Sequence, residues 1–313
     1  MKSTQPKPAQ PWVACIGEIL WDCFPDRKVL GGAPLNCSYM AQCMGARALA
    51  ISRVGDDPDG QSILQVMKDK GLDTSCVQVD PAHPTGIVRV AVSAGGEPTY
   101  TIVENAAYDF LAWEEKLAEP LSRCDAVCFG SLAQRNPAGR AGILRMMDQA
   151  QKALKIYDIN LRQNFFSREI LAGGFKRAQV VKLNDGELEV LQKLFASDFT
   201  GGIRGFMKRY AIELMAVTHG AEGCSLYRGG EEVHAPGLKV TVADTVGSGD
   251  AFTASLILSC LKRLPLAKIG REANLWGAYV ATQRGGTPEI NAEAVQKLRG
   301  MFDGTRQTTD DRR

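Results

Sequence analysis

The feature that most restricts the fold of this sequence is an alternation between short apolar runs and longer amphipathic stretches. The apolar runs at 13–17 and 48–54 predict buried strands, and residues 57–70 predict a helix that begins at Pro58 and stops at Gly71. The same order recurs in strands at 126–129, 155–159, 179–183 and 213–218 and in helices at 138–153 and 186–195. This alternation is typical of a mainly parallel sheet that is covered by helices on both faces.

One region departs from the alternation. Two β-rich segments, 86–92 and 99–103, flank Gly95-Gly96 and predict an antiparallel hairpin. An isolated hairpin is not stable in water, so we expect a small β-sheet that covers a site, pairs with another subunit, or does both. We therefore expect one domain over residues 12–302, with this lid drawn from about 18–35 and 77–105. We expect flexible tails at 1–11 and 305–313.

Composition argues against several kinds of partner. The chain has 37 Lys and Arg against 35 Asp and Glu, so its net charge of +2 gives no reason to expect nucleic acid or anionic membrane. No apolar stretch is long enough to cross a bilayer, and the first eleven residues lack the apolar core of a secretion signal, so a cytoplasmic location is expected. Nine scattered cysteines without a Cys-x-x-Cys pair, and only three histidines, predict reduced thiols and no structural metal.

The strongest chemical signal is the segment Asp-Thr-Val-Gly-Ser-Gly-Asp-Ala-Phe at 244–252, which opens an apolar helix. Small residues at a helix start let a phosphate approach backbone N–H groups, where the helix dipole favours negative charge. A carboxylate in this turn, Asp250, can accept a proton from an attacking hydroxyl. The structural alternative is a tight turn followed by an ordinary helix N-terminal charge. The order of all nine residues favours the chemical interpretation.

This segment resembles the second signature of the ribokinase-like (PfkB) carbohydrate kinases, written DTxGAGDxF, with Ser248 at the usual alanine position. The resemblance covers roughly residues 13–299, with the motifs in the family's order. It implies a ribokinase-like α/β fold, with a central mainly parallel sheet, helices on both faces and a small β-sheet lid. It also implies that Asp250 is the catalytic base and that backbone amides of Gly247, Ser248, Gly249 and Asp250 form an anion hole.

Three further elements resemble the sugar-binding parts of that family. The run Gly-Gly-Ala-Pro-Leu-Asn at 31–36, with Arg-Val-Gly-Asp-Asp later in the chain, resembles the first signature and implies that Gly32 and Asn36 contact the sugar. Asn36 offers both a donor and an acceptor, although a helix N-cap is the structural alternative. Asp22 resembles the aspartate that binds sugar hydroxyls. Arg162, in Asp-Ile-Asn-Leu-Arg, is expected to hold the sugar or the transferred phosphate.

The nucleotide side carries two motifs. Asn184 and Glu187 match the family's N-x-x-E element, in which the glutamate organises Mg²⁺ through water. An ordinary acid in the first turn of a helix is the alternative for Glu187. The run at 218–223 resembles the T-x-G-x-x-G nucleotide turn and implies contacts from Thr218, Gly220 and Gly223.

The remaining expectations concern neighbours of these motifs. Asn274 lies in a late helix that flanks adenine in relatives, whereas His219 is given no chemical role. The resemblance also implies a monovalent cation, such as K⁺, near the backbone carbonyls of Asp244 and Val246. Gly286 stands in the closing segment of the family, where alanine is usual.

Local features favour fructose as the sugar. Gly17-Glu18, Ala33-Pro34 and the run Gly-Ser-Leu-Ala-Gln-Arg at 130–135 resemble bacterial fructokinases, although Tyr108 and Arg135 could equally be structural. The sequence therefore predicts an ATP- and Mg²⁺-dependent kinase of fructose. A kinase of ribose, 2-keto-3-deoxygluconate or a nucleoside is the alternative, and a non-catalytic sensor is a weaker one. The exposed edge of the lid predicts a homodimer through the lids.

Overall fold

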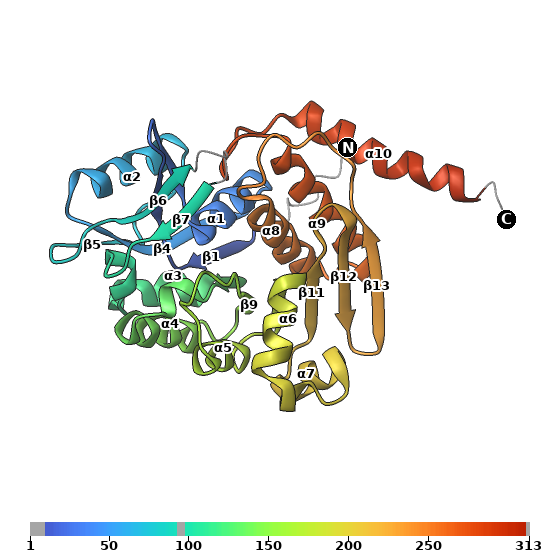
Figure 1. The fold of residues 1–313 in the computed structure, drawn as a ribbon, viewed down its shortest axis with the longest axis horizontal. Coiled ribbons are helices and arrows are strands. Elements are labelled where there is room, and N and C mark those ends of the chain that lie inside the picture. Colours follow the sequence, from blue (N-terminus) through green and yellow to red (C-terminus); the bar gives the residue numbers. More distant parts are fainter. Residues whose placement is uncertain (1–9, 93–97, 311–313) are drawn as a thin grey trace, which may run out of the picture.

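The computed structural model describes residues 10–92 and 98–310 (Figure 1). Its main sheet has nine strands in the order β13-β12-β11-β10-β9-β8-β1-β4-β5. Seven of them are parallel, and β12 and β13 add an antiparallel edge. The strands are β1 (Trp12–Ile16), β4 (Arg47–Gly55), β5 (Val77–Asp80), β8 (Ala126–Phe129), β9 (Leu154–Asp158), β10 (Val180–Asn184), β11 (Leu214–Thr218), β12 (Gly223–Arg228) and β13 (Glu231–Pro236).

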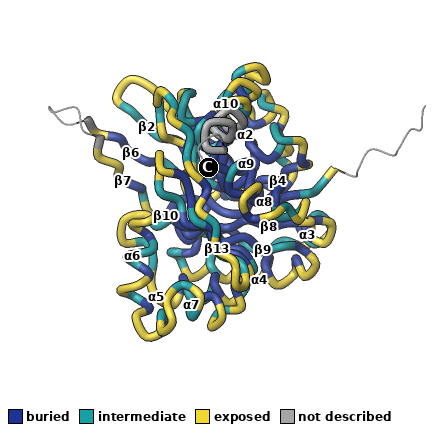
Figure 2. Tube along the Cα trace, turned by 90° about the vertical axis from the view of Figure 1, so that its right-hand side faces the viewer, coloured by how far each residue is buried: buried dark blue, intermediate teal, exposed yellow. Residues whose placement is uncertain are grey.

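The two faces of this sheet belong to separate hydrophobic cores. In β1, Val13 and Cys15 pack in one core while Ala14 and Ile16 pack in the other. This division follows from the two-residue period of a strand, and both sides are apolar because helices cover both faces. Figure 2 shows the central strands β8 and β9 as buried, whereas the outer helices carry exposed residues.

One face is covered by α1 (Ala33–Cys43), α8 (Ser248–Leu261) and α9 (Leu266–Ala281), joined by α2 (Pro58–Asp69) and α10 (Ala292–Asp310). The other face is covered by α3 (Ala118–Arg123), α4 (Pro137–Gln149), α5 (Arg168–Phe175), α6 (Asp185–Leu194) and α7 (Gly202–Tyr210). Every strand and helix expected from the alternation is present, with ends that differ by a few residues. Among the described helices, none combines the length and apolar character that a membrane crossing needs.

The lid is a separate four-stranded sheet in the order β3-β2-β6-β7. Its strands are β2 (Leu20–Cys23), β3 (Lys28–Gly31), β6 (Gly86–Val92) and β7 (Pro98–Ile102). The expected hairpin is confirmed by the antiparallel pairing of β6 with β7, while its Gly95-Gly96 turn lies outside the described residues. The lid projects from the β1 and β4 side of the main sheet in Figure 1.

Two boundaries in the sequence analysis were wrong. Strand β5 pairs in parallel with β4 and belongs to the main sheet, so the second lid segment begins at Gly86 and not at residue 77. A short strand contains no signal for which of two sheets it will join. At the other end, the tail expected from 305 instead continues α10 through Asp310, since no proline interrupts that segment.

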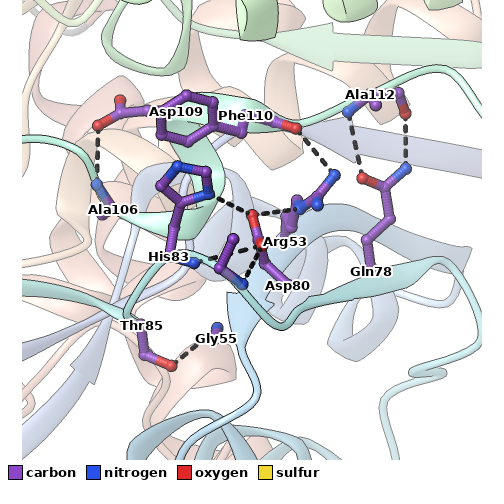
Figure 3. Close-up of polar contacts among 11 residues, drawn as sticks. Arg53, Gly55, Gln78, Asp80, His83, Thr85, Ala106, Asp109, Phe110 and Ala112 are labelled. Carbon is purple, nitrogen blue, oxygen red and sulfur yellow. Dashed lines mark hydrogen bonds and ion pairs between the residues drawn. The ribbon is translucent and has the colours of Figure 1, made fainter.

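The connection from β5 into β6 is fixed by polar contacts, which we call the lid root: Arg53, Asp57, Asp80, His83 and Thr85. Asp80 is buried, accepts hydrogen bonds from the Ala82 amide (2.8 Å) and the His83 ring (2.9 Å), and forms an ion pair with Arg53 Nε (2.8 Å) (Figure 3). The His83 ring stacks on Phe110 with ring centroids 3.6 Å apart. These contacts hold the start of the lid against the main sheet.

Asp57, the N-cap of α2, completes the lid root. It accepts bonds from the Gly60 amide (2.7 Å), the Thr85 amide (2.8 Å) and the Thr85 hydroxyl (2.7 Å). Arg53 and Asp57, expected as part of a sugar-kinase signature, therefore anchor the lid.

A second buried ion pair fixes the end of the lid. Arg135 donates two bonds of 2.7 Å to Asp109 and another of 2.7 Å to the carbonyl of Val103, just after β7. Tyr108 is fully buried, and a Cβ on Gly86 would lie 2.5 Å from its ring. The contacts of Tyr108 and Arg135 thus favour a structural role for both residues over a role in sugar recognition.

Candidate active site

A cleft of about 480 Å³ lies where the carboxyl ends of the parallel strands meet the lid and the start of α8. Open α/β sheets bind ligands at this end of the strands. The main sheet contributes Glu18 after β1, Asn160 and Arg162 after β9, Asn184 on β10 and Thr218 on β11. Helix α8 contributes Gly249 and Asp250, and the lid contributes Asp22, Val88, Tyr100 and Ile102.

Asp250 lies in the first turn of α8, beside Asn36 of α1. The Asn36 side-chain amide donates to Asp250 Oδ2 at 2.8 Å, across 214 residues of sequence. Burial raises the pKa of Asp250 to about 6, as does the nearby Asp158, while the Asn36 bond, Lys182 and Arg162 oppose the rise. A carboxyl with this pKa is ionised at neutral pH and can still accept a proton efficiently.

Asn36 is buried within α1 and is not its N-cap, which is Gly32. The N-cap alternative was therefore wrong, because the helix begins four residues earlier than that role requires. The side-chain oxygen of Asn36 has no partner among the described residues, so an acceptor remains available in the cleft.

The glycine-rich turn presents the first amides of α8. Gly247 is the N-cap with φ +79°, and a Cβ there would lie 2.4 Å from Gly286. The Ser248 amide donates to the Thr245 carbonyl (3.2 Å) and so closes the turn. The amides of Gly249 and Asp250 lie in the first turn of α8, where no helix carbonyl is available to accept their hydrogen bonds. They are therefore the donors best placed to bind an anion.

A buried cation below this turn was missed by the sequence analysis. Lys182 of β10 donates to both oxygens of Asp158 on β9 (3.1 and 3.2 Å), and Asp158 also accepts from Thr253 of α8 (2.7 Å). Lys182 lines the cleft, and a Cβ on Gly249 would lie 3.2 Å from its Nζ. Neighbouring carboxylates, Asp158 first, raise its pKa against the opposing effect of burial. A charged residue inside the apolar run at 180–184 was the available signal.

The sugar-side candidates lie close together. Asp22 on β2 and Gly32 before α1 line the cleft with Arg162. Burial raises the pKa of Asp22 to about 6, whereas the Arg162 charge lowers it. Gly32 has φ +112°, and a Cβ there would lie 2.4 Å from the Glu18 carbonyl, so only glycine fits. The structure thus brings together all four residues expected to hold the sugar: Asp22, Gly32, Asn36 and Arg162.

Glu187 forms a capping box at the start of α6. Its carboxylate accepts from the amides of Asn184 and Leu161, both at 2.8 Å, and its own amide donates to Asn184 Oδ1 at 2.9 Å. Asn184 lines the cleft, whereas Glu187 lies behind it. Glu187 therefore acts as an acid in the first turn of a helix, the structural alternative given for it. Its bond to the Leu161 amide also fixes the loop that carries Arg162.

The described residues contain no cluster of three or more His, Cys, Asp or Glu that could hold a metal ion. A magnesium ion would therefore be bound mainly by phosphate oxygens and water. Each Glu187 oxygen keeps a second lone pair for such a water. The donor set fits Mg²⁺ in this outer role only.

A second, mostly apolar pocket of about 460 Å³ adjoins the cleft and shares Thr218, Thr245 and Gly249 with it. Gly220 and Gly223 of the expected nucleotide turn line this pocket with Thr218, and so does Asn274 from the late helix. The Asn274 amide donates to the carbonyls of Ala235 and Pro236 (2.9 and 3.1 Å). The pocket has the dimensions and apolar lining of a small-ligand site.

Two remaining candidates hold the surrounding loops. His219 bridges Asp185 (2.7 Å) and Ser225 (2.8 Å). Asp244 accepts from the amides of Val246 and Gly285, both at 3.0 Å, and so ties the glycine-rich turn to the closing loop. A Cβ on Gly286 would lie 2.5 Å from Asn36 Nδ2, so glycine leaves room for this amide.

Asp250 and the first amides of α8 lie in a cleft that adjoins an apolar pocket, in a ribokinase-like α/β fold, and this arrangement suits a phosphotransferase. Residues 15–292 match the pfkB family of carbohydrate kinases, so this chain belongs to that family.

Known relatives agree with this assignment. Fructokinase-1 of Zea mays is 28% identical over 309 residues, covering 90% of this chain and 95% of the relative. An uncharacterized sugar kinase from Pyrococcus horikoshii has a crystal structure with a TM-score of 0.79 and 27% identity, covering 91% of this chain and 97% of that one. A fructokinase from Vibrio cholerae O395 in the fructose, ADP and calcium ion bound form gives a TM-score of 0.75 and 25% identity, with 92% and 99% covered.

Proposed function

We propose that this carbohydrate kinase transfers the γ-phosphoryl group of ATP to a hydroxyl of fructose, with Asp250 as the general base. The observation that carries the proposal is the position of Asp250, in the first turn of α8 and bonded to Asn36. The fructokinases among its relatives, including one that binds fructose and ADP, support fructose as the sugar.

In this mechanism the sugar lies between Asp22, Asn36, Arg162 and the lid, and the nucleotide extends from Asn184 toward the apolar pocket. Asn36 occupies Asp250 Oδ2, which leaves Oδ1 to accept the hydroxyl proton. As the sugar oxygen bonds to the γ-phosphorus, the bond to the β,γ-bridging oxygen breaks and ADP leaves. When bound, Mg²⁺ neutralises charge on the phosphates, and K⁺ beside the carbonyls of Asp244 and Val246 is proposed to support the turn.

The amides of Gly247, Gly249 and Asp250 stabilise the charge on the transferring group, and Lys182 adds a fixed positive charge below them. Closure of the lid over the bound sugar would limit access of water, which could otherwise accept the phosphoryl group.

The test is ADP release from MgATP with fructose, ribose, glucose, 2-keto-3-deoxygluconate and adenosine as separate acceptors. We expect a fast response with fructose and a slow background without sugar. A response to another acceptor alone would replace fructose and keep the reaction type. No response to any acceptor would contradict the proposed transfer.

The proposed homodimer uses the lid edges. Strands β3 and β7 are the outer strands of the lid sheet, and outer strands of this kind can pair with another subunit. Light scattering after size-exclusion chromatography measures the mass directly, and a monomeric mass at micromolar concentration would contradict this part of the proposal.

A further inference from the structure

Glu18 is a buried acid in the cleft with no role in the mechanism above. It lies in the loop between β1 and β2, and only 4% of its surface is exposed. It lines the main cleft together with Asp250, Asn36 and Arg162.

The carboxylate of Glu18 is incompletely bonded. Its Oε2 is buried and has no hydrogen-bond partner among the described residues. A buried polar atom without a partner costs free energy, so a structure that keeps one needs a reason for it. Buried acids away from the sugar have partners on both oxygens, as the contacts of Asp80, Asp109, Asp158 and Asp198 show.

The loop around Glu18 is held in place by close packing. Gly17 has φ +149°, and a Cβ there would lie 2.7 Å from Pro34. The Glu18 carbonyl packs against Gly32, and the Ala33 amide interacts with the Glu18 carboxyl. The carboxyl therefore stays at the start of α1, on the same side of the cleft as Asp22 and Gly32.

This position is the sugar side of the cleft. Thr218, which joins the cleft to the apolar pocket, belongs to the nucleotide side. Glu18 does not line the apolar pocket, and its backbone contacts Gly32, one of the residues expected to hold the acceptor.

We propose that Glu18 is a specificity-determining residue whose unpartnered Oε2 hydrogen-bonds one hydroxyl of the acceptor sugar. This inference rests on the proposed function for the identity of the acceptor. A ligand that lacks this hydroxyl would leave the buried oxygen unpaired, and sites built to bind a hydroxyl reject such analogues strongly. The contact would thereby select among small polyols that Asp250 could otherwise activate.

Both protonation states of Glu18 suit a hydroxyl. Burial raises the pKa of Glu18 to about 7, and the Asp250 charge acts in the same direction. The amides of Glu18 and Ala33 and the Arg162 charge oppose the rise. A hydroxyl donates to the ionised carboxylate and accepts from the neutral acid, so the contact persists across neutral pH.

The test compares wild type with Glu18→Ala and with the isosteric Glu18→Gln. Binding of the sugar that the acceptor panel selects, fructose being expected, and of its monodeoxy analogues is measured by calorimetry without nucleotide. The kcat/KM values are measured in parallel. Asp198→Asn, a buried acid outside the cleft that is bonded to Arg168, Arg209 and Tyr210, is the matched control.

We expect wild type to bind one monodeoxy analogue about 10- to 100-fold more weakly than the parent sugar, and Glu18→Ala to reduce that ratio below about threefold. The ratios for the other analogues should stay unchanged, and Asp198→Asn should keep the wild-type pattern. Glu18→Gln should fold and should lose part of the selectivity at the same hydroxyl.

Three results would overturn the inference. The first is that Glu18→Ala retains the full selectivity, and the second is that it weakens the binding of all analogues equally. The third is that wild type binds no sugar of the panel. If Glu18→Ala loses selectivity in binding while wild type releases no ADP with any acceptor, the result would support the Glu18 contact and contradict phosphoryl transfer. The two proposals can therefore fail separately.

Discussion

The lid root and the cleft both contain buried or partly buried carboxylates, and the two regions treat them in opposite ways. At the lid root, backbone amides, Thr85, His83 and Arg53 bond to Asp57 and Asp80, and these bonds outweigh burial and lower both pKa values. In the cleft, burial dominates and raises the pKa values of Glu18, Asp22 and Asp250 to about 7, 6 and 6. A carboxylate whose oxygens all have hydrogen-bond or ion-pair partners stabilises the fold, whereas a carboxylate with an unpartnered oxygen is available to a ligand.

The largest effect that would test this difference is on turnover. Asp250→Asn should lower kcat by a factor of about 10² to 10⁴, because the amide cannot accept the hydroxyl proton. Steady-state ADP release measures the change, with nucleotide affinity by calorimetry as the control for folding. Near-normal turnover in this variant would remove Asp250 from the role of base.

An aspartate-to-asparagine substitution at the lid root should lower the stability of the fold. Asp80→Asn leaves Arg53 without its charge partner and should lower the free energy of unfolding by about 3 kcal/mol. Urea denaturation measures this, with Asp26→Asn at an exposed ion pair as the control, where the change should stay below about 1 kcal/mol. Equal stability of the Asp80 and Asp26 variants would contradict the distinction between the regions.

The two regions should also differ in how stability depends on pH. Because the pKa of Asp250 rises from 3.8 to about 6 on folding, ionisation of this group favours the unfolded chain as pH rises through that window. Asp250→Asn should therefore be more stable than wild type at pH 8, by on the order of 2 kcal/mol, and this advantage should vanish near pH 3.5.

Asp80 is expected to change stability with pH in the opposite direction. Its lowered pKa contributes stability above its ordinary value, and this contribution is lost as pH falls through the folded value. Denaturation curves at several pH values for both variants test the pair. An Asp250→Asn advantage that does not change with pH would show that the Asp250 carboxyl is not destabilised by burial.

The smallest effect concerns the bond that tunes Asp250. Asn36 lowers the pKa of Asp250, so Asn36→Ala should raise that pKa and move the acid limb of the kcat/KM profile upward from about pH 6. At pH 7 the loss of activity should be roughly tenfold, from this shift and the lost sugar contact. An unmoved acid limb would indicate that another group controls it.

The order of strands and helices could be predicted from the sequence because hydrophobic period and turn residues are local signals. The start of α8 was equally readable, since small residues and an acid are typical of a helix N-terminus. The assignment of β5 to a sheet, the continuation of α10 and the Lys182–Asp158 pair were not readable in this way. Each depends on neighbours that are distant in sequence.

What the sequence determined by itself was therefore the α/β alternation, the glycine-rich turn and the place of Asp250 in the first turn of a helix. Only the tertiary structure decided which acids are satisfied. Asn36 meets Asp250 across 214 residues and Thr253 meets Asp158 across 95. The pKa of a carboxyl depends on burial and on such partners, and both arise only when the chain is packed.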